Sequence, residues 1–321
     1  MTYITIIVPC YNEEKYIKQC IESIFQSDYP RNFYEVIMID GNSSDNTVNI
    51  IREHKEIILL HNPKKIVPIS MNMGLEIAKG EYIIRLDAHS YFPKDYFSKL
   101  IRFAIELNSD NIGGVCVTKP KVKTNKSVAI CEVLINRFGV GNSLFRIGAN
   151  KILEVDTVPF GCFKRNVFEK FGLYDSRLER NQDLELNKRI KKGGGRIFLV
   201  PSIHCIYFAR ETFGDLARNN FANGLWNIKT VIITNTFSSL SLRHFVPLFF
   251  LLSLIIPLIL MVIWKGFFLV TLVVLLAYLL VTFYVSIPIV KSKKINIFLV
   301  IYSFFVLHLS YGFGSLVGFF R

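Results

Sequence analysis

The chain has no acidic residue in its C-terminal quarter. From His244 to Arg321 it contains no aspartate or glutamate, and all 25 acidic residues of the 321-residue chain lie in the first 243 positions. The only basic residues in this region are Lys265, Lys291, Lys293, Lys294 and Arg321. A helix on the surface of a soluble domain carries a charged face, and this region has too few charges to supply one. The tail is therefore predicted to be a membrane anchor, with a set of buried core helices as the alternative.

Motifs that would place the chain in other classes are also missing. The first apolar run ends in PCYNEE, which contains no glycine, so the GxGxxG turn of a dinucleotide-dependent oxidoreductase is absent. No nucleic-acid-binding module is recognisable, although the net charge is +13. The basic balance instead indicates other anionic partners: phospholipid headgroups, a lipid diphosphate or a nucleotide diphosphate.

The six cysteines form no CxxC pair, and most of them have apolar neighbours. They are predicted to be reduced, buried residues of a cytosolic domain rather than a disulfide framework. The N-terminus begins directly with an apolar strand pattern and has no basic segment followed by a long apolar one. We therefore expect no signal peptide.

Three uncharged spans occupy the tail, at residues 245–264, 266–290 and 295–320. Each is long enough to cross the hydrocarbon core of a bilayer. A lysine cluster between the second and third spans predicts a cytoplasmic loop, and two crossings separate that loop from the N-terminal domain, which is then cytoplasmic too. Residues 212–243 have intermediate polarity and are predicted to lie in the membrane interface.

The first 90 residues alternate between strand and helix patterns. Apolar runs at 4–9, 35–40, 57–60 and 82–86 are typical of strands buried on both faces. Helical patterns are predicted at 17–25, 45–53 and 68–79, with Asp45 placed to cap the second and Gly80 ending the third. This alternation implies an α/β domain with a mostly parallel sheet covered by helices on both faces. Residues 91–201 are less regular, with a further strand at 197–200 and a helix-ending glycine turn at 193–195.

Polar residues directly follow three of these strands, in the segments PCYNE, DGNSSD and DAH. Ligands of an open parallel sheet bind beyond the carboxyl ends of its strands. One Asp-Gly pair would indicate only a turn. Three carboxylate-bearing loops at the same edge predict a single binding crevice.

These segments resemble glycosyltransferase family 2, the inverting enzymes with a GT-A nucleotide-sugar fold. The matching stretches are IIVPCYNEE, VIMIDGNSSDNT, SMNMGLEIAKGEYIIRLDAHS and ERNQDLELNKRI. The variant RLDAHS, followed by a hydrophobic C-terminus, is most similar to the succinoglycan-biosynthesis type of exopolysaccharide glycosyltransferase. The resemblance implies a Rossmann-like GT-A domain followed by C-terminal transmembrane helices.

The resemblance also assigns the donor site. Pro9, Tyr11 and Glu13 match the first nucleotide-binding loop, in which the carboxylate holds the ribose or the base. Asp40 matches the aspartate that recognises uracil, and a carboxylate can indeed accept the imide N–H of that base. The resemblance therefore implies a UDP-sugar donor.

Asp87 and His89 stand where the family has its DxD motif, which holds a divalent cation that bridges the diphosphate of the donor. Neutral imidazole suits manganese better than magnesium, so this DxH variant favours Mn²⁺ over Mg²⁺. In the alternative interpretation His89 only caps the loop, and Asp87 alone contacts the metal or the ribose.

On the acceptor side, Asp183 matches the catalytic base, with Gln182 in place of the usual glutamate before it. As the alternative, Asp183 serves only the dipole of the helix that it begins. Gly161 matches a family glycine near the acceptor sugar. Trp226 is loosely similar to the tryptophan of the QxxRW motif of processive synthases, whose Gln and Arg are absent here. His204 could reach the metal or the diphosphate, or could serve only as a local hydrogen bonder.

The implied reaction is transfer of a hexose from a UDP-sugar to a polyprenyl-diphosphate-linked saccharide during capsule or exopolysaccharide assembly at the plasma (inner) membrane. The expected domains are a cytosolic catalytic domain at 1–211, interfacial helices at 212–243 and a membrane domain at 244–321. Two alternatives stay open: transfer to polyprenyl phosphate itself, and a transporter or channel with a regulatory nucleotide-binding domain. The lack of an intramembrane carboxylate disfavours a transporter or channel.

Overall fold

The computed structural model describes residues 1–236 and 242–320, and the chain divides into two compact units. The first unit contains Met1–Val117 and Leu144–Phe208, and the second contains Thr118–Ser143 and Ala209–Arg321. Residues 118–143 fall within the catalytic domain expected from the sequence, whereas in the structure they pack with the C-terminal helices.

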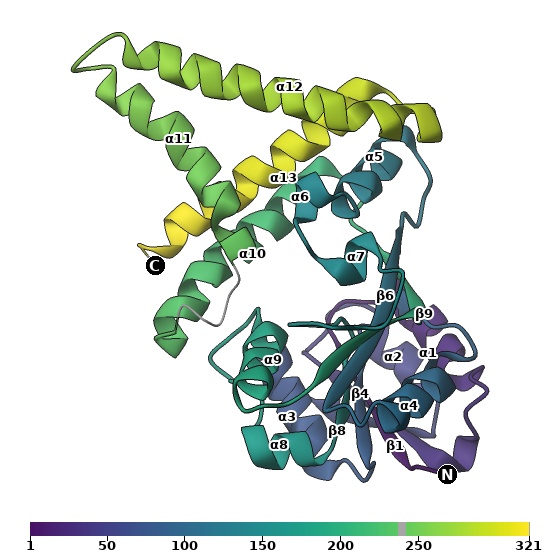
Figure 1. The fold of residues 1–321 in the computed structure, drawn as a ribbon. Coiled ribbons are helices and arrows are strands. Elements are labelled where there is room, and N and C mark those ends of the chain that lie inside the picture. Colours follow the sequence, from purple (N-terminus) through teal and green to yellow (C-terminus); the bar gives the residue numbers. More distant parts are fainter. Residues whose placement is uncertain (237–241, 321) are drawn as a thin grey trace. The chain divides into compact units, whose positions relative to one another are not determined.

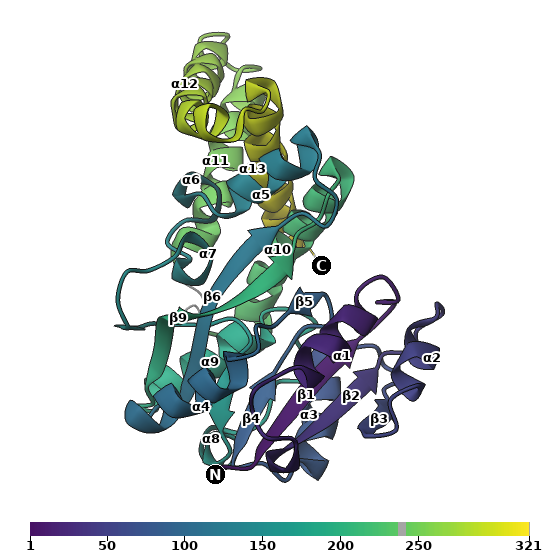
Figure 2. The same cartoon turned by 90° about the vertical axis from the view of Figure 1, so that its right-hand side faces the viewer.

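A nine-stranded sheet forms the centre of the first unit, in the order β3-β2-β1-β4-β8-β6-β9-β5, with β7 also paired to β9. Strands β1 to β4 are mutually parallel where they pair and lie side by side in Figure 2. The pairings β4–β8, β6–β8, β5–β9 and β7–β9 are antiparallel. The strands are β1 (Ile4–Cys10), β2 (Tyr34–Asp40), β3 (Ile57–His61), β4 (Tyr82–Arg85), β5 (Ser90–Tyr91), β6 (Asn111–Lys119), β7 (Leu153–Glu154), β8 (Cys162–Lys164) and β9 (Ile197–Phe208).

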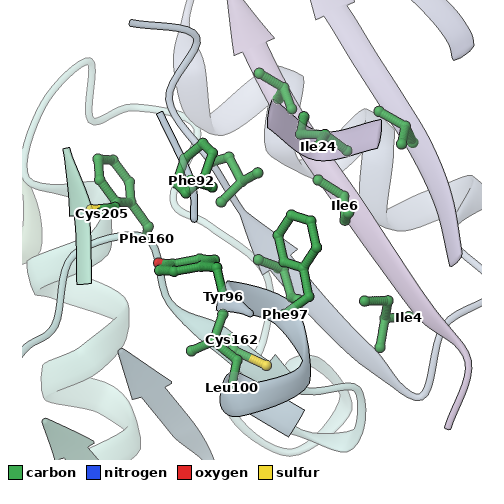
Figure 3. Packing of buried hydrophobic residues seen from close by; sticks show 14 of the residues in the cluster. Ile4, Ile6, Ile24, Phe92, Tyr96, Phe97, Leu100, Phe160, Cys162 and Cys205 are labelled. Atoms are coloured by element: carbon green, nitrogen blue, oxygen red, sulfur yellow. The ribbon is translucent and has the colours of Figure 1, made fainter. Parts of the chain in front are cut away.

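Helices cover both faces of the parallel strands, as predicted. Alternate side chains of a strand point to opposite faces, so Ile4 and Ile6 pack with α1 and α4 while Ile7 packs with α3, α8 and α9. Figure 3 shows the first of these clusters, in which Phe97 of α4 lies beside Ile4 and Ile6 of β1 and Leu100 lies beside Cys162. The helices of this unit are α1 (Ile17–Phe25), α2 (Thr47–Arg52), α3 (Val67–Ile77), α4 (Tyr96–Glu106), α7 (Leu144–Ile147), α8 (Asn166–Phe171) and α9 (Gln182–Lys192), with a 3₁₀ turn at Arg31–Phe33.

The elements predicted in the first 90 residues are confirmed, with ends that shift by at most two residues. Asp45 precedes the first turn of α2, and its Oδ1 accepts the backbone N–H of Thr47 at 3.0 Å. The predicted strand at 197–200 is too short, because β9 continues to Phe208 on a partly exposed stretch without an apolar run. All six cysteines are buried, as predicted.

The second unit is helical. Its elements are α5 (Asn125–Leu134), α6 (Arg137–Val140), α10 (Phe213–Thr234), a 3₁₀ turn at Leu242–Phe245, α11 (Val246–Leu260), α12 (Phe267–Lys293) and α13 (Ile297–Gly318). Three of its helices, at Leu242–Leu260, Phe267–Lys293 and Ile297–Gly318, are long and apolar enough to cross a membrane, in agreement with the three predicted spans (Figure 1). Helix α5 docks on this group: Ala129 and Val133 pack with Phe304 of α13, and Lys293 pairs with Glu132 at 2.9 Å.

Three glycines of α13 are packing positions. Glycine in a helix interior usually weakens the helix, yet α13, which contains Gly312, Gly314 and Gly318, is continuous. A Cβ at Gly314 would collide with the carbonyl of Phe221 on α10, and one at Gly312 would lie 2.5 Å from the carbonyl oxygen of Pro247. The glycines therefore permit α13 to approach α10 and α11 closely, as small residues do between helices in membranes.

Gly80 provides a test of the sheet packing. A Cβ there would lie 2.7 Å from the carbonyl carbon of Ile4 and from the carbonyl oxygen of Tyr82, both in paired strands. We expect Gly80→Ala to lower the free energy of unfolding by about 1–3 kcal/mol, the usual cost of overpacking. Thermal unfolding of the detergent-solubilised protein measures this. Gly214→Ala is the control, because among the described residues its Cβ would meet Thr212 Oγ1 at 3.9 Å and nothing closer. Equal stability of the two variants would contradict the claim that Gly80 is required for close packing of the strands.

Candidate active site

The loops that follow β1 and β2 are joined by hydrogen bonds between side chains and backbone. Asn12 N donates to Ser43 Oγ at 2.9 Å, and Asn12 Oδ1 accepts from Ser44 N at 2.8 Å. Glu13 N donates to Thr47 Oγ1 at 2.8 Å. Asn12 itself has a φ of 54°, a conformation that asparagine tolerates better than most residues. Two of the three predicted loops therefore form one pre-ordered surface.

Asp40 lies at the end of β2 with its carboxylate turned into its own loop. Its Oδ2 accepts from Asn42 N at 3.0 Å and lies 3.3 Å from His61 Nδ1, and both carboxylate oxygens lie 3.2 Å from Ser43 N. The residue is only 2% exposed. Asp40 thus orders the loop after β2, and its contact with a nucleotide base stays a prediction.

Glu13 and His89 form a second connection across the site. Glu13 Oε1 lies 3.0 Å from His89 Nδ1, so the carboxylate favours the tautomer that carries the proton on Nδ1. The imidazole lies between two aromatic rings, with centroids 6.3 Å from Tyr16 and 5.3 Å from Tyr207. Tyr207 comes from β9, which pairs with β5 directly after the DAH segment. In this structure Glu13 therefore orients His89, a contact that the family resemblance does not assign to it.

Tyr11 stands at the exposed side of this surface. Its ring is under Lys65, whose Nζ lies 5.1 Å from the ring centroid, and Tyr11 is 47% exposed. Pro9 lies within β1, opposite Ile39 of β2. A cavity of about 310 Å³ begins at this lysine and is lined by Lys64, Lys65, Ile66, Val67, Glu179 and Arg180. It connects the nucleotide-loop side of the sheet with the segment that leads into α9, and its basic side chains suit a phosphorylated ligand.

Arg85 connects the third loop with α9. This last residue of β4 places Nη2 3.1 Å from Asp87 Oδ1 and Nη1 3.2 Å from Asp183 Oδ2. Burial lowers the pKa of the guanidinium, but Asp87 and Asp183 outweigh it, so the net shift is upward and the charge is permanent. Arg85 was not among the predicted site residues. A charged residue at the end of the buried strand YIIR is nevertheless a sequence feature that could have indicated its place in the site.

Asp183 belongs to the first turn of α9, after Asn181 turns the chain with a φ of 62°. Its Oδ1 accepts the backbone N–H of Leu184 at 3.0 Å, and its side chain is 36% exposed. Gln182 is 5% exposed, and its Oε1 has no hydrogen-bond partner within the described part of the chain. The structure thus brings Asp87 and Asp183 together, and it buries Gln182 behind them.

The other predicted residues have different surroundings. The carbonyl of Gly161 accepts the N–H of Arg85 at 3.0 Å, and a Cβ there would lie 2.5 Å from Asn111 Oδ1, so packing alone explains this glycine. Trp226 is buried on α10 in the second unit, 4.8 Å from Lys229 Nζ. His204 is exposed on β9, where it adds to the effect of Lys99 in lowering the pKa of Asp95.

The protein supplies few donor atoms for a cation at this site. Among residues 1–236 and 242–320, no group of three or more His, Cys, Asp or Glu side chains could hold a metal ion. Asp87 Oδ2 accepts no hydrogen bond from any described residue, and Glu13 orients His89. Mg²⁺ and Mn²⁺ are octahedral and take about six ligands, so the two side chains fit such a cation only if a ligand supplies further oxygens, as a diphosphate does.

The fold and the polar loops at the edge of the sheet define a class of protein. A sheet of four parallel strands extended by antiparallel ones, with polar loops at the carboxyl ends of the parallel strands, has the architecture of the GT-A nucleotide-sugar fold. The chain superposes on the mannosyltransferase PcManGT of Pyrobaculum calidifontis, solved with GDP-Man and Mn²⁺, with a TM-score of 0.62 at 16% identity. The alignment covers 99% of this chain and 87% of that one. At this identity the likeness shows the fold alone.

Sequence comparison shows the family. Residues 5–172 match the family described as glycosyl transferase family 2, and the chain belongs to this family. It is 29% identical over 265 residues to the dolichyl N-acetyl-alpha-D-glucosaminyl phosphate 3-beta-D-2,3-diacetamido-2,3-dideoxy-beta-D-glucuronosyltransferase of Methanococcus voltae, covering 80% of this chain and 82% of that protein. It is 29% identical over 233 residues to the succinoglycan biosynthesis protein ExoA of Rhizobium meliloti (strain 1021), covering 71% and 69%. The resemblance inferred from the motifs is confirmed: the chain is a glycosyltransferase.

Proposed function

We propose that the protein transfers a hexose from a UDP-sugar to a lipid-linked saccharide at a membrane surface, with inversion at the anomeric carbon. One observation carries this proposal: the candidate donor-side carboxylate of Asp87 and the candidate base Asp183 lie 3.1 and 3.2 Å from the same guanidinium. Donor and acceptor residues that are distant in sequence therefore occupy one site. The three apolar helices and the lipid-linked substrate in the name of the Methanococcus relative support a lipid-linked acceptor.

Asp183 serves as the general base in this mechanism. It takes the proton of the acceptor hydroxyl while that oxygen attacks the anomeric carbon from the face opposite the departing nucleoside diphosphate. The neighbouring carboxylates are less suited: Glu185 is bound to Arg189 at 2.6 and 2.8 Å, and Glu179 is exposed on the segment before α9. Asp183 is both accessible and fixed by two hydrogen bonds.

Asp87 and His89 would hold a divalent cation, with Mn²⁺ favoured over Mg²⁺ because of the imidazole. Such a cation neutralises charge on the leaving diphosphate when it is bound. The chain contributes Asp87 Oδ2, which Arg85 does not bond, and holds His89 against Glu13.

The membrane orientation follows from the lysine cluster at the C-terminal end of α12. We place the first unit on the cytoplasmic side of the plasma (inner) membrane, where nucleotide sugars are available, because Lys291, Lys293 and Lys294 lie two crossings from it. The acceptor is a polyprenyl-diphosphate saccharide, and polyprenyl phosphate itself is the competing acceptor. Mild acid releases the labelled sugar from the lipid extracted from membranes, and thin-layer analysis then distinguishes the two acceptors. A larger saccharide indicates a lipid-linked saccharide acceptor, and a free monosaccharide indicates polyprenyl phosphate.

Removal of metal is the first test. We expect nucleotide release from the donor to stop in excess EDTA and to recover better with Mn²⁺ than with Mg²⁺. The release of UDP from UDP-sugars and of GDP from GDP-sugars is measured side by side. Full activity in EDTA would contradict the cation proposal, and release from GDP-sugars alone would contradict the UDP assignment.

The second test separates chemistry from binding. Asp183→Asn keeps the shape but removes the proton acceptor, so transfer should fall by roughly 10²–10⁴-fold while UDP affinity is nearly unchanged. Asp40→Asn should weaken UDP binding, because it loses the charge that orders the loop after β2. Calorimetric titration of UDP and a transfer assay are run together.

Asp175→Asn is the matched control for both substitutions. Its carboxylate pairs with the neighbouring Arg177 at 2.7 Å and touches neither candidate. Near-normal turnover of Asp183→Asn would place the base elsewhere. A loss of UDP affinity in that variant as large as in Asp40→Asn would make Asp183 a structural residue.

The third test concerns orientation. Three crossings separate the chain ends, so a tag at the N-terminus should be cytoplasmic and one at the C-terminus extracytoplasmic. Protease accessibility in sealed inverted vesicles reports both. Protection of both tags together would show that one of the three helices does not cross.

A further inference from the structure

The two carboxylates with the central roles are joined by a residue to which the family resemblance gives no role. We propose that Arg85 is a positioning residue, which holds the side chains of Asp87 and Asp183 in one fixed arrangement and so couples the donor side of the site to the base. This inference rests on the proposed function and goes beyond it, because it concerns how the two sides are held rather than what each does.

The two terminal nitrogens of the Arg85 guanidinium bind different carboxylates. Arg85 uses different nitrogens for the two carboxylates, Nη2 for Asp87 Oδ1 and Nη1 for Asp183 Oδ2. Its own side chain is 12% exposed, against 27% for Asp87 and 36% for Asp183. The guanidinium therefore lies below the two carboxylates, and each of them keeps an accessible side for a ligand.

The surroundings of the arginine are buried, and its backbone is fixed. Tyr174 is 2% exposed, and the nearby Arg85 charge offsets part of the rise that burial causes in the pKa of its hydroxyl. Neither this hydroxyl nor Arg85 Nε has a hydrogen-bond partner within the described part of the chain. The backbone of Arg85 donates to the carbonyl of Gly161 at 3.0 Å. With this backbone fixed and both Nη atoms bonded to carboxylates, the planar fork has little freedom to turn away from Asp87 and Asp183.

The charge balance explains why an arginine is required here. Two carboxylates at one site repel each other, and a single permanent cation between them offsets that repulsion. Lysine is a point charge with no fork, so it can hold one carboxylate well but not both in a fixed plane. Arg85 also occupies only Oδ1 of Asp87, which leaves Oδ2 for a cation or the donor.

Three readouts on purified protein test the proposal. For Arg85→Gln we expect kcat for transfer to fall by about 10²-fold, as for a small misplacement of reacting groups, while the Kd for UDP changes less than about 3-fold. Arg85→Lys should recover about 10-fold of this loss, since it restores the charge but not the fork. A purely structural role predicts a fall in Tm and parallel changes in kcat and UDP affinity, without rescue by lysine.

Arg165→Gln is the matched control. Arg165 is a partly buried arginine of the same unit whose guanidinium donates to the carbonyls of Ala78 and Gly80 at 2.6 and 3.2 Å rather than to carboxylates. It should lower Tm and leave kcat unchanged. If Arg85→Gln does not fold, Arg85→Lys decides: a wild-type kcat for the lysine variant overturns the proposal, and a selective fall in kcat supports it.

The outcomes also separate this inference from the proposed function. A wild-type protein that binds no nucleotide and transfers no sugar contradicts the proposed function itself. An active wild type whose Arg85→Gln variant folds and keeps its kcat overturns the positioning role alone. UDP calorimetry and thermal unfolding do not require turnover, so both are informative in either case.

Discussion

Burial of β1, β2 and β4 on both faces is the constraint from which the rest of the catalytic unit follows. A strand that packs against helices above and below has no place for charge along its length, because burial of an unpaired charge is costly. Polar residues are therefore confined to the strand ends. The parallel arrangement brings Cys10 and Asp40 into register at one edge, with Arg85 only a few residues behind them on β4. The convergence of polar side chains at this edge is thus a direct consequence of how the sheet is packed.

Burial of the strand also explains why the charge of Arg85 needs compensating partners. A guanidinium at the end of a buried strand is tolerated because two carboxylates and permanent ionisation compensate its desolvation. Neither carboxylate lies on the strand itself: Asp87 follows it by two residues and Asp183 begins a helix 98 positions later. The ion pairs that stabilise Arg85 are thus the same contacts on which its proposed positioning role depends.

In the second unit the organising feature is close approach of backbones rather than burial of large side chains. Gly224 of α10 and Gly314 of α13 each face a carbonyl of the other helix at a distance that leaves no room for a Cβ. Helix α5, from the middle of the sequence, adds an apolar face and the Glu132–Lys293 ion pair to the same group. Between apolar helices in lipid, such packing supplies the association that the hydrophobic effect supplies in water.

The sequence by itself determined the elements and the class of protein. Alternating apolar runs predicted β1 to β4 and their helices, uncharged spans predicted α11 to α13, and the loops PCYNE, DGNSSD and DAH predicted the crevice. These signals are local, since a strand or helix is visible in the period of its own residues. Family membership followed from the same segments and is confirmed.

Only the tertiary structure decided which of these residues meet. The bond of Glu13 to His89 and the fork of Arg85 between Asp87 and Asp183 join segments that no periodicity relates. The docking of α5 on the C-terminal helices and the extension of β9 belong to the same category. Such contacts depend on the path of the whole chain, because a long-range pair leaves no repeating pattern in the sequence near either partner.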